Sequence, residues 1–290
     1  MKKIILMMSL LLVSSQFAYA ANNDPLEIMR RVSDLDNGDS QYSRSVIATC
    51  RYQIKAGKMA CAEKPRVKKM EGASKDYGKD GKDSRSINII LQPAAEKGIG
   101  FLAYDYDNPN RDSDQWMYLS AMGKVKRIVS GSDNEAKSGT MFGSEISYED
   151  VEPTHVEDYV YKLVKEETFA GRPCWIIESR PKPHRARKSN YSRSVSWIDK
   201  ERDLVLQSQL YDRSGRPIKH ILFSGYEKVN GIWISKRMNV NNIQSRRITT
   251  MKTEQVIINP SVEDGLFKLR TLTDGAYREQ QLRILRKGLQ

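Results

Sequence analysis

The chain has few of the residues that enzymes commonly use for catalysis or metal binding. Its 290 residues include three histidines and three cysteines, and the histidines show no HxH or HExxH spacing. The sequence also has no GxSxG motif, Walker loop or CxxC pair. We therefore expect a protein that is not an enzyme, with no catalytic residue, cofactor or metal. Carboxylates are frequent without any pair standing out, which leaves a glycan hydrolase as an alternative.

Long apolar runs are also scarce, and the clearest one lies at the N-terminus. Lys2 and Lys3 precede the apolar residues 4–13, and residues 18–20 read Ala-Tyr-Ala. This pattern predicts a secretory signal peptide, residues 1–20, that is cleaved after Ala20. The apolar run is too short to span a bilayer. Because short signals of this kind are typical of bacteria, we expect a periplasmic protein.

Positive charge exceeds negative charge in the mature chain. Without the two N-terminal lysines, 46 basic and 36 acidic residues give a net charge of +10. This charge favours anionic partners such as lipid headgroups, envelope polymers or an acidic protein surface, and it allows peripheral contact with a membrane. An exported chain rarely meets nucleic acid, and no nucleic-acid-binding motif is present, so we expect no such partner.

The densest basic stretch is residues 180–193, in which two prolines are expected to prevent regular structure. One interpretation is a docking loop for anionic headgroups or an acidic partner. The other is a solvated loop with no binding role. The basic residues of this stretch are Arg180, Lys182, Arg185, Arg187, Lys188 and Arg193.

Two of the cysteines flank a predicted hairpin turn. If residue 55 lies opposite residue 58, Cys50 faces residue 63, and Cys61 is its diagonal neighbour on the same face of the hairpin. An oxidising compartment permits a disulfide between them, and the sequence leaves the bridged and the free forms open. Cys174 is expected to be a buried thiol.

The secondary-structure signals predict one helix followed by many strands. Asp24 and Pro25 are typical of a helix start, and Ile28, Val32 and Leu35 share one face. Such a helix either packs on a sheet or lines a cavity. Residues 72–83 are expected to form a flexible loop.

The remaining chain is typical of one antiparallel sheet. Apolar strand-like runs occupy residues 87–91, 99–106 and 115–119, and strands of about ten residues with turn residues between them follow from 156 to 259. This spacing predicts an α+β protein that is mainly β, with an antiparallel sheet or barrel. We expect one domain, residues 21–270, and a basic amphipathic tail, residues 271–290.

Several stretches together resemble a known family. They are the first helix, GIGFLAYDYDNPNRDSDQWMYLSAMGKVKRI, MFGSEISYEDVE, SWIDKERDLVLQSQLYDRSG and GYEKVNGIWISKRMNV. Their order resembles the LolA-like periplasmic carriers, in particular the outer-membrane lipoprotein-sorting branch, over roughly residues 24–269. Leu119-Ser120 replaces the Leu-Pro of that branch, and the cysteine pair and basic tail are departures from it.

The resemblance implies a strongly curved antiparallel sheet that forms an incomplete, half-open β-barrel, with helices covering its concave face and a hydrophobic cavity between. It also implies a carrier that moves the acyl chains of a lipoprotein or lipid between envelope membranes. The alternative is an accessory or sensor subunit of an inner-membrane exporter of the resistance-nodulation-division type or of an envelope-stress pathway.

A carrier must bury an acyl chain that costs about 0.8 kcal/mol per methylene in water, on the order of 12 kcal/mol for sixteen carbons. Apolar strand residues are the candidates, although alternation alone does not separate a cavity from a core. Met141 and Phe142 could form a mobile lid or a plain turn. The candidate cavity residues are Ile87, Ile89, Leu91, Phe101, Trp116, Tyr118, Met141, Phe142, Leu204, Leu206, Leu210, Ile221 and Phe223.

Overall fold

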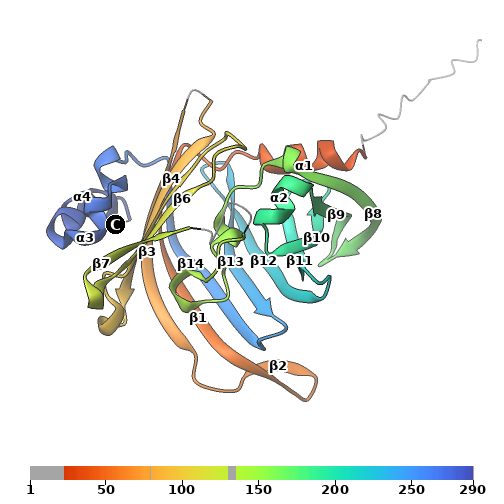
Figure 1. Ribbon diagram of the computed structural model, residues 1–290, viewed down its shortest axis with the longest axis horizontal. Coiled ribbons are helices and arrows are strands. Elements are labelled where there is room, and N and C mark those ends of the chain that lie inside the picture. Colours follow the sequence, from red (N-terminus) through yellow and green to blue (C-terminus); the bar gives the residue numbers. More distant parts are fainter. Residues whose placement is uncertain (1–22, 79, 130–134, 290) are drawn as a thin grey trace, which may run out of the picture.

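The computed structural model describes residues 23–78, 80–129 and 135–289, so the predicted signal peptide and its cleavage site lie outside the described residues. The described chain forms one strongly curved antiparallel sheet (Figure 1). The strand order is β7-β6-β5-β4-β3-β1-β14-β13-β12-β11-β10-β9-β8, with β2 paired to β1. Because β7 and β8 end this order, the barrel is open between them. The prediction of a mainly β protein with an open, curved antiparallel sheet is confirmed.

The strands are β1 (Ser40–Lys55), β2 (Lys58–Cys61), β3 (Arg66–Tyr77), β4 (Asp83–Gln92), β5 (Gly100–Asp105), β6 (Asp114–Leu119), β7 (Lys124–Ile128), β8 (Tyr159–Phe169), β9 (Arg172–Pro181), β10 (Tyr191–Asp199), β11 (Val205–Asp212), β12 (Pro217–Val229), β13 (Ile232–Asn242) and β14 (Arg247–Ile258). The α-helices of the described residues are α1 (Pro25–Ser33), α2 (Pro183–Lys188), α3 (Leu269–Thr273) and α4 (Gly275–Lys287). None of these helices is long and apolar enough to cross a membrane.

Helix α1 begins where the sequence predicts. The Asp24 side chain accepts a hydrogen bond from the Leu26 N–H at 3.1 Å, which caps the first turn, and Pro25 takes the first helical position. Ile28 is completely buried in a cluster with Trp175 and Ile177 of β9. This contact holds α1 against the half of the sheet that contains β9.

Strands β3 to β6 are covered on both faces. On one face, Ile87 and Ile89 belong to a core cluster with residues of α3, α4 and the segment before them. On the other face, Ile90 and Phe101 belong to a cluster with Tyr148, whose ring stacks on Phe101 at a centroid distance of 5.7 Å. Figure 1 shows α3 and α4 beside β3 and β4, on the outside of the curved sheet.

The C-terminal segment is part of this domain and not a separate tail. Leu282 is 1% exposed and Leu285 is 5% exposed, both in the cluster that covers β4 and β5. The guanidinium of Arg286 also pairs with Glu71, a carboxylate that is 1% exposed on β3. The helical spacing of the leucines therefore reflects packing on the sheet, and the domain extends beyond residue 270.

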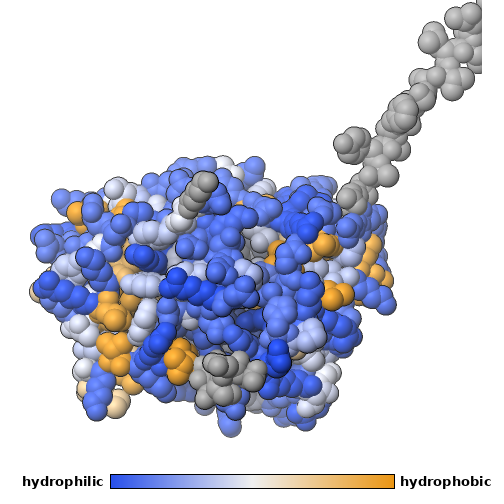
Figure 2. Space-filling view, turned by 45° about the horizontal axis from the view of Figure 1, so that its top comes forward, coloured by the Kyte–Doolittle hydropathy of each residue, from blue (hydrophilic) through white to orange (hydrophobic). Residues whose placement is uncertain are grey.

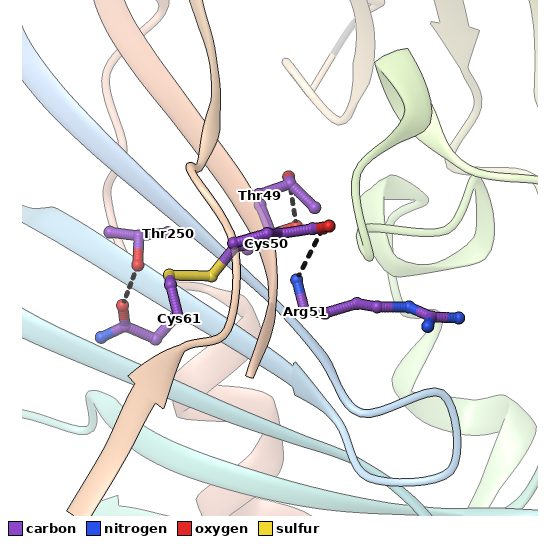
Figure 3. The surroundings of a disulfide bond; sticks show 8 residues. Thr49, Cys50, Arg51, Cys61 and Thr250 are labelled. Carbon is purple, nitrogen blue, oxygen red and sulfur yellow. Dashed lines mark hydrogen bonds between the residues drawn. A yellow bond between two sulfur atoms is a disulfide. The ribbon is translucent and has the colours of Figure 1, made fainter. Parts of the chain in front are cut away.

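Cys50 and Cys61 are joined in a disulfide with a Cα–Cα distance of 5.8 Å (Figure 3). Lys55 pairs with Lys58 in the β1–β2 hairpin, which is the register that places the two cysteines diagonally on one face. Cys174 is a buried free thiol, and burial raises its pKa.

The prediction of a flexible loop at residues 72–83 is wrong for its first half, because β3 continues to Tyr77. A Cβ atom at Gly72 would lie 2.3 Å from Oδ1 of Asn88 on the neighbouring strand, so the Asn88 side chain would have to move. Ala73 is buried in the same core cluster as Ile87. The small residues therefore mark close strand packing, which a local reading mistakes for a loop.

Candidate functional site

A cavity lies within the half of the sheet formed by β8 to β12. Its volume is about 520 Å³, within the range of small-molecule sites. The outer surface seen in Figure 2 is mainly hydrophilic, with apolar residues in small separate groups. The apolar lining of the cavity comes from α1, the segment before β8, and β8 to β12. It includes Met29, Val32, Pro153, Val156, Tyr161, Pro181, Val205, Leu210, Ile221 and Phe223.

The floor of this cavity is hollow because small residues occupy it. Ser179 of β9, Ser194 and Ser196 of β10, and Ser208 of β11 all line it. Ser194 lies opposite Ser179, and Ser196 lies opposite Ser208, in the registers of neighbouring strands. The same strands bury isoleucine, leucine and tryptophan elsewhere, so four serines in two facing pairs leave space that larger side chains would fill.

Residues 139–152, which we call the inner segment, pack against strand residues in two of the core clusters. Its Ile146 is 1% exposed and packs with Leu210, Ile221 and Val240 of the barrel strands. The inner segment therefore separates the cavity from the core cluster under β3 to β6.

Acidic residues tie the inner segment to its surroundings. Glu145 pairs with Arg247 of β14 at 2.6 Å, and Glu152 pairs with Lys137 at 2.7 Å. Glu149 accepts hydrogen bonds from Ser189 at 2.5 Å and from Arg185 at 3.3 Å. These contacts involve the stretch MFGSEISYEDVE, one of the motifs that carries the family resemblance.

A further buried network closes the polar end of the cavity. The Lys219 ammonium lies 2.5 Å from one oxygen of Asp150 and donates to the Tyr191 hydroxyl at 2.8 Å. Tyr191 donates to the other Asp150 oxygen at 2.6 Å. Burial, followed by the charge of Asp150, raises the pKa of Tyr191, so the phenol stays protonated. The network anchors the inner segment to β10 and β12.

The comparison with known proteins supports one family. A DUF1329 family protein from Desulfovibrio piger ATCC 29098 is 29% identical, with a TM-score of 0.75 over 86% of this chain and 97% of that one. A family model described as "Uncharacterized protein" matches residues 82–274, more than half of the chain. The chain belongs to this DUF1329-like family.

Two further structures relate the DUF1329-like chain to lipoprotein-sorting proteins. A domain from Vibrio parahaemolyticus, named for outer membrane lipoprotein sorting, is 26% identical, with a TM-score of 0.73 over 86% of this chain and 98% of that one. A LolA superfamily protein from Nitrosomonas europaea shares the fold at 16% identity, with a TM-score of 0.61 over 84% and 97% of the two chains. No curated protein matches the chain. The resemblance to the LolA-like family is confirmed.

Three of the predicted cavity residues line the cavity of this DUF1329-like chain: Leu210, Ile221 and Phe223. Leu204 and Leu206 lie instead in a core cluster with Trp197. A register irregularity between β10 and β11 causes this difference, because Ile198 pairs with Val205 while Trp197 pairs with Gln207. Val205 therefore faces the cavity, and simple alternation along this strand points to the wrong leucines.

The predicted residues on β4 to β6 do not line the cavity. Ile87 and Ile89 are buried against the C-terminal helices, and Trp116 and Tyr118 pack at the edge of the same cluster. Leu91 is half-buried near the end of β4. These strands carry apolar residues because α3 and α4 cover their outer face.

The remaining predicted residues form part of the core beside the inner segment. Phe101, Met141 and Phe142 lie in the core cluster on the inner face of β3 to β6. Met141 and Phe142 are 5% and 6% exposed, and the Phe142 carbonyl accepts a hydrogen bond from the Lys68 ammonium at 2.7 Å. The structure thus places them in the core and not at the cavity.

The basic stretch is more regular than we expected. Pro183 stands at the start of helix α2, where proline is favoured, so the expectation that prolines prevent regular structure is wrong. Arg180 and Arg193 both pair with Glu178. Lys188 pairs with Asp112 at 2.9 Å.

Two of the other cations of this stretch also have partners in the described residues. Arg185 pairs with Glu149, and Lys182 donates to the Glu157 carbonyl at 2.6 Å. Arg187 is exposed. Internal ion pairs thus explain most of this charge, and docking of an anionic partner stays a prediction.

Proposed function

We propose that this protein binds the acyl chain of a lipid or lipoprotein in the cavity and carries it between the membranes of the bacterial envelope. The observation that carries the proposal is the cavity inside a half-open barrel, with apolar lining residues from α1, β11 and β12. The name of the Vibrio parahaemolyticus relative, an outer membrane lipoprotein-sorting domain, supports the same role. The predicted signal peptide supports export to the periplasm.

The energetics favour an apolar occupant. Each methylene that moves from water into an apolar site contributes about 0.8 kcal/mol. The lining offers Leu210, Ile221 and Phe223 of the strands together with Met29 and Val32 of α1. An acyl chain in contact with these side chains is removed from water, as transport through the aqueous periplasm requires.

The test begins with native mass spectrometry of the mature protein from its own periplasm, followed by organic extraction. We expect a bound acylated species in stoichiometric amount. In addition, the delipidated protein should bind a fluorescent fatty acid. A protein that is isolated empty and also fails to bind the probe would contradict the proposal.

A cavity-filling variant locates the binding site. Val205→Trp places a large side chain in the cavity, and we expect probe affinity to fall at least about tenfold, a loss of about 1.4 kcal/mol. Val160→Trp is the matched control because Val160 is 59% exposed on the edge strand β8. The control should bind as the unchanged protein does. Equal affinity of the two variants would place the binding site elsewhere.

A further inference from the structure

Two serines of the cavity floor have hydroxyl groups without a protein partner. Ser179 and Ser194 lie directly opposite each other on β9 and β10, and both line the cavity. Ser179 is only 6% exposed. Within the described ranges of the chain, neither side-chain hydroxyl makes a hydrogen bond to protein, and neither oxygen is fully buried, so both are open to the cavity. The other serine pair differs, since the Ser196 and Ser208 hydroxyls bond each other at 2.8 Å.

Buried polar groups in folded proteins nearly always have a hydrogen-bond partner. A hydroxyl that loses its water on binding of a purely aliphatic ligand has no replacement partner, and this weakens the binding. Alanine would be equally small and would avoid this loss. The two serines therefore fit a ligand that brings a hydrogen-bonding group of its own to this part of the cavity, beside the apolar side chain of Leu210.

The charged groups near this pair are already engaged. Arg193 stacks its guanidinium 3.3 Å from the centre of the Tyr211 ring and pairs with Glu178. Ser194 itself lies opposite Leu210 on its other side, so apolar surface adjoins the pair. The ligand group that meets Ser179 and Ser194 is thus a neutral polar group within the aliphatic part of the ligand and not an ionic headgroup.

From this arrangement, and resting on the proposed function, we infer that the ligand carries a hydroxylated acyl chain whose hydroxyl hydrogen-bonds Ser179 and Ser194. A hydroxyl group is both donor and acceptor, and two facing serines offer one of each. The rest of the chain contacts Leu210, Ile221 and Phe223. The serine pair then selects for hydroxylated acyl chains over unsubstituted chains of equal length.

The test is competition against a fluorescent fatty acid on the full, delipidated mature chain. The competitors are stearic acid and a set of stearic acids with one hydroxyl each at different carbons. We expect at least one hydroxylated isomer to bind about five- to tenfold more tightly than stearic acid, as loss of a buried hydrogen bond implies.

Variants assign any preference to the serine pair. The double variant Ser179→Ala, Ser194→Ala should bind all competitors equally and keep or improve its affinity for stearic acid. Ser86→Ala is the control, because it removes a serine hydroxyl from β4, which contributes no residue to the cavity lining. This control should retain the preference for the hydroxylated isomer.

The outcomes separate this inference from the proposed function. If the unchanged protein binds stearic acid and every hydroxylated isomer equally, the inference is overturned while the carrier function stands. The inference is also overturned if the double variant keeps the preference. If none of the fatty acids binds, the proposed function itself fails.

Discussion

The Lys219→Met substitution tests whether the buried network holds the inner segment in place. Lys219 and Asp150 have side-chain exposures of 6% and 4%, and their charged atoms lie 2.5 Å apart. Methionine keeps the length and the apolar stem of lysine but removes the ammonium group. Asp150 then keeps its hydrogen bonds from the Tyr191 hydroxyl and the Ser147 N–H and loses its counter-charge.

Removal of one partner of a buried ion pair costs about 3–5 kcal/mol, because the other charge stays buried without compensation. Since Asp150 retains two hydrogen bonds, we expect a loss of about 3 kcal/mol in the free energy of unfolding. Urea denaturation followed by tryptophan fluorescence measures it, with the slope of the transition compared between variants.

Arg270→Met is the control for this experiment. Arg270 pairs with Asp274, and their side chains are 65% and 35% exposed, so the loss should stay below about 1 kcal/mol. A Lys219→Met variant that loses no more than this control would refute the idea that the network anchors the inner segment.

Three further predictions concern other parts of the fold. Burial raises the pKa of Asp105 to about 6, so its contribution to stability is present at low pH and is lost as the pH rises from about 4 to about 6. The thermal unfolding midpoint of the unchanged protein should fall over this pH range, and the midpoint of Asp105→Asn should not show this fall. In urea denaturation, Leu282→Ala should lower the free energy of unfolding by about 2–5 kcal/mol, because Leu282 is buried. Ile284→Ala should lower it by less than about 0.5 kcal/mol, because Ile284 is 63% exposed. Replacement of Cys50 and Cys61 by serine should lower the free energy of unfolding by about 2–3 kcal/mol, because the disulfide restricts a short loop in the unfolded chain.

Each of these predictions has a contradicting result. Equal pH profiles for the unchanged protein and the Asp105 variant would contradict the burial argument. Equal losses for Leu282→Ala and Ile284→Ala would mean that α4 does not pack on the sheet. A reductant should destabilise the unchanged protein and leave the double cysteine variant unaffected, and the opposite pattern would count against the disulfide.

Local sequence patterns determined much of the architecture. Asp24 and Pro25 marked the start of α1, and the turn at residues 56 and 57 placed Cys50 and Cys61 on one face of a hairpin. Apolar alternation and turn spacing predicted an antiparallel sheet that is mainly β. These features depend on residues that are close together in the chain, so they can be predicted without knowledge of the tertiary structure. The order of short motifs indicated the LolA-like family.

The position of the cavity was decided only by the tertiary structure. Ile87 and Leu210 look alike in a strand pattern, yet C-terminal helices cover the first and the cavity adjoins the second. One irregular pairing turns Val205 inward in place of Leu206. The space inside the cavity also depends on which small residues lie opposite each other on neighbouring strands, as Ser179 and Ser194 do. Apolar alternation along a strand predicts which residues share one face of the sheet. It does not predict what packs on that face, because this depends on segments that are distant in the chain.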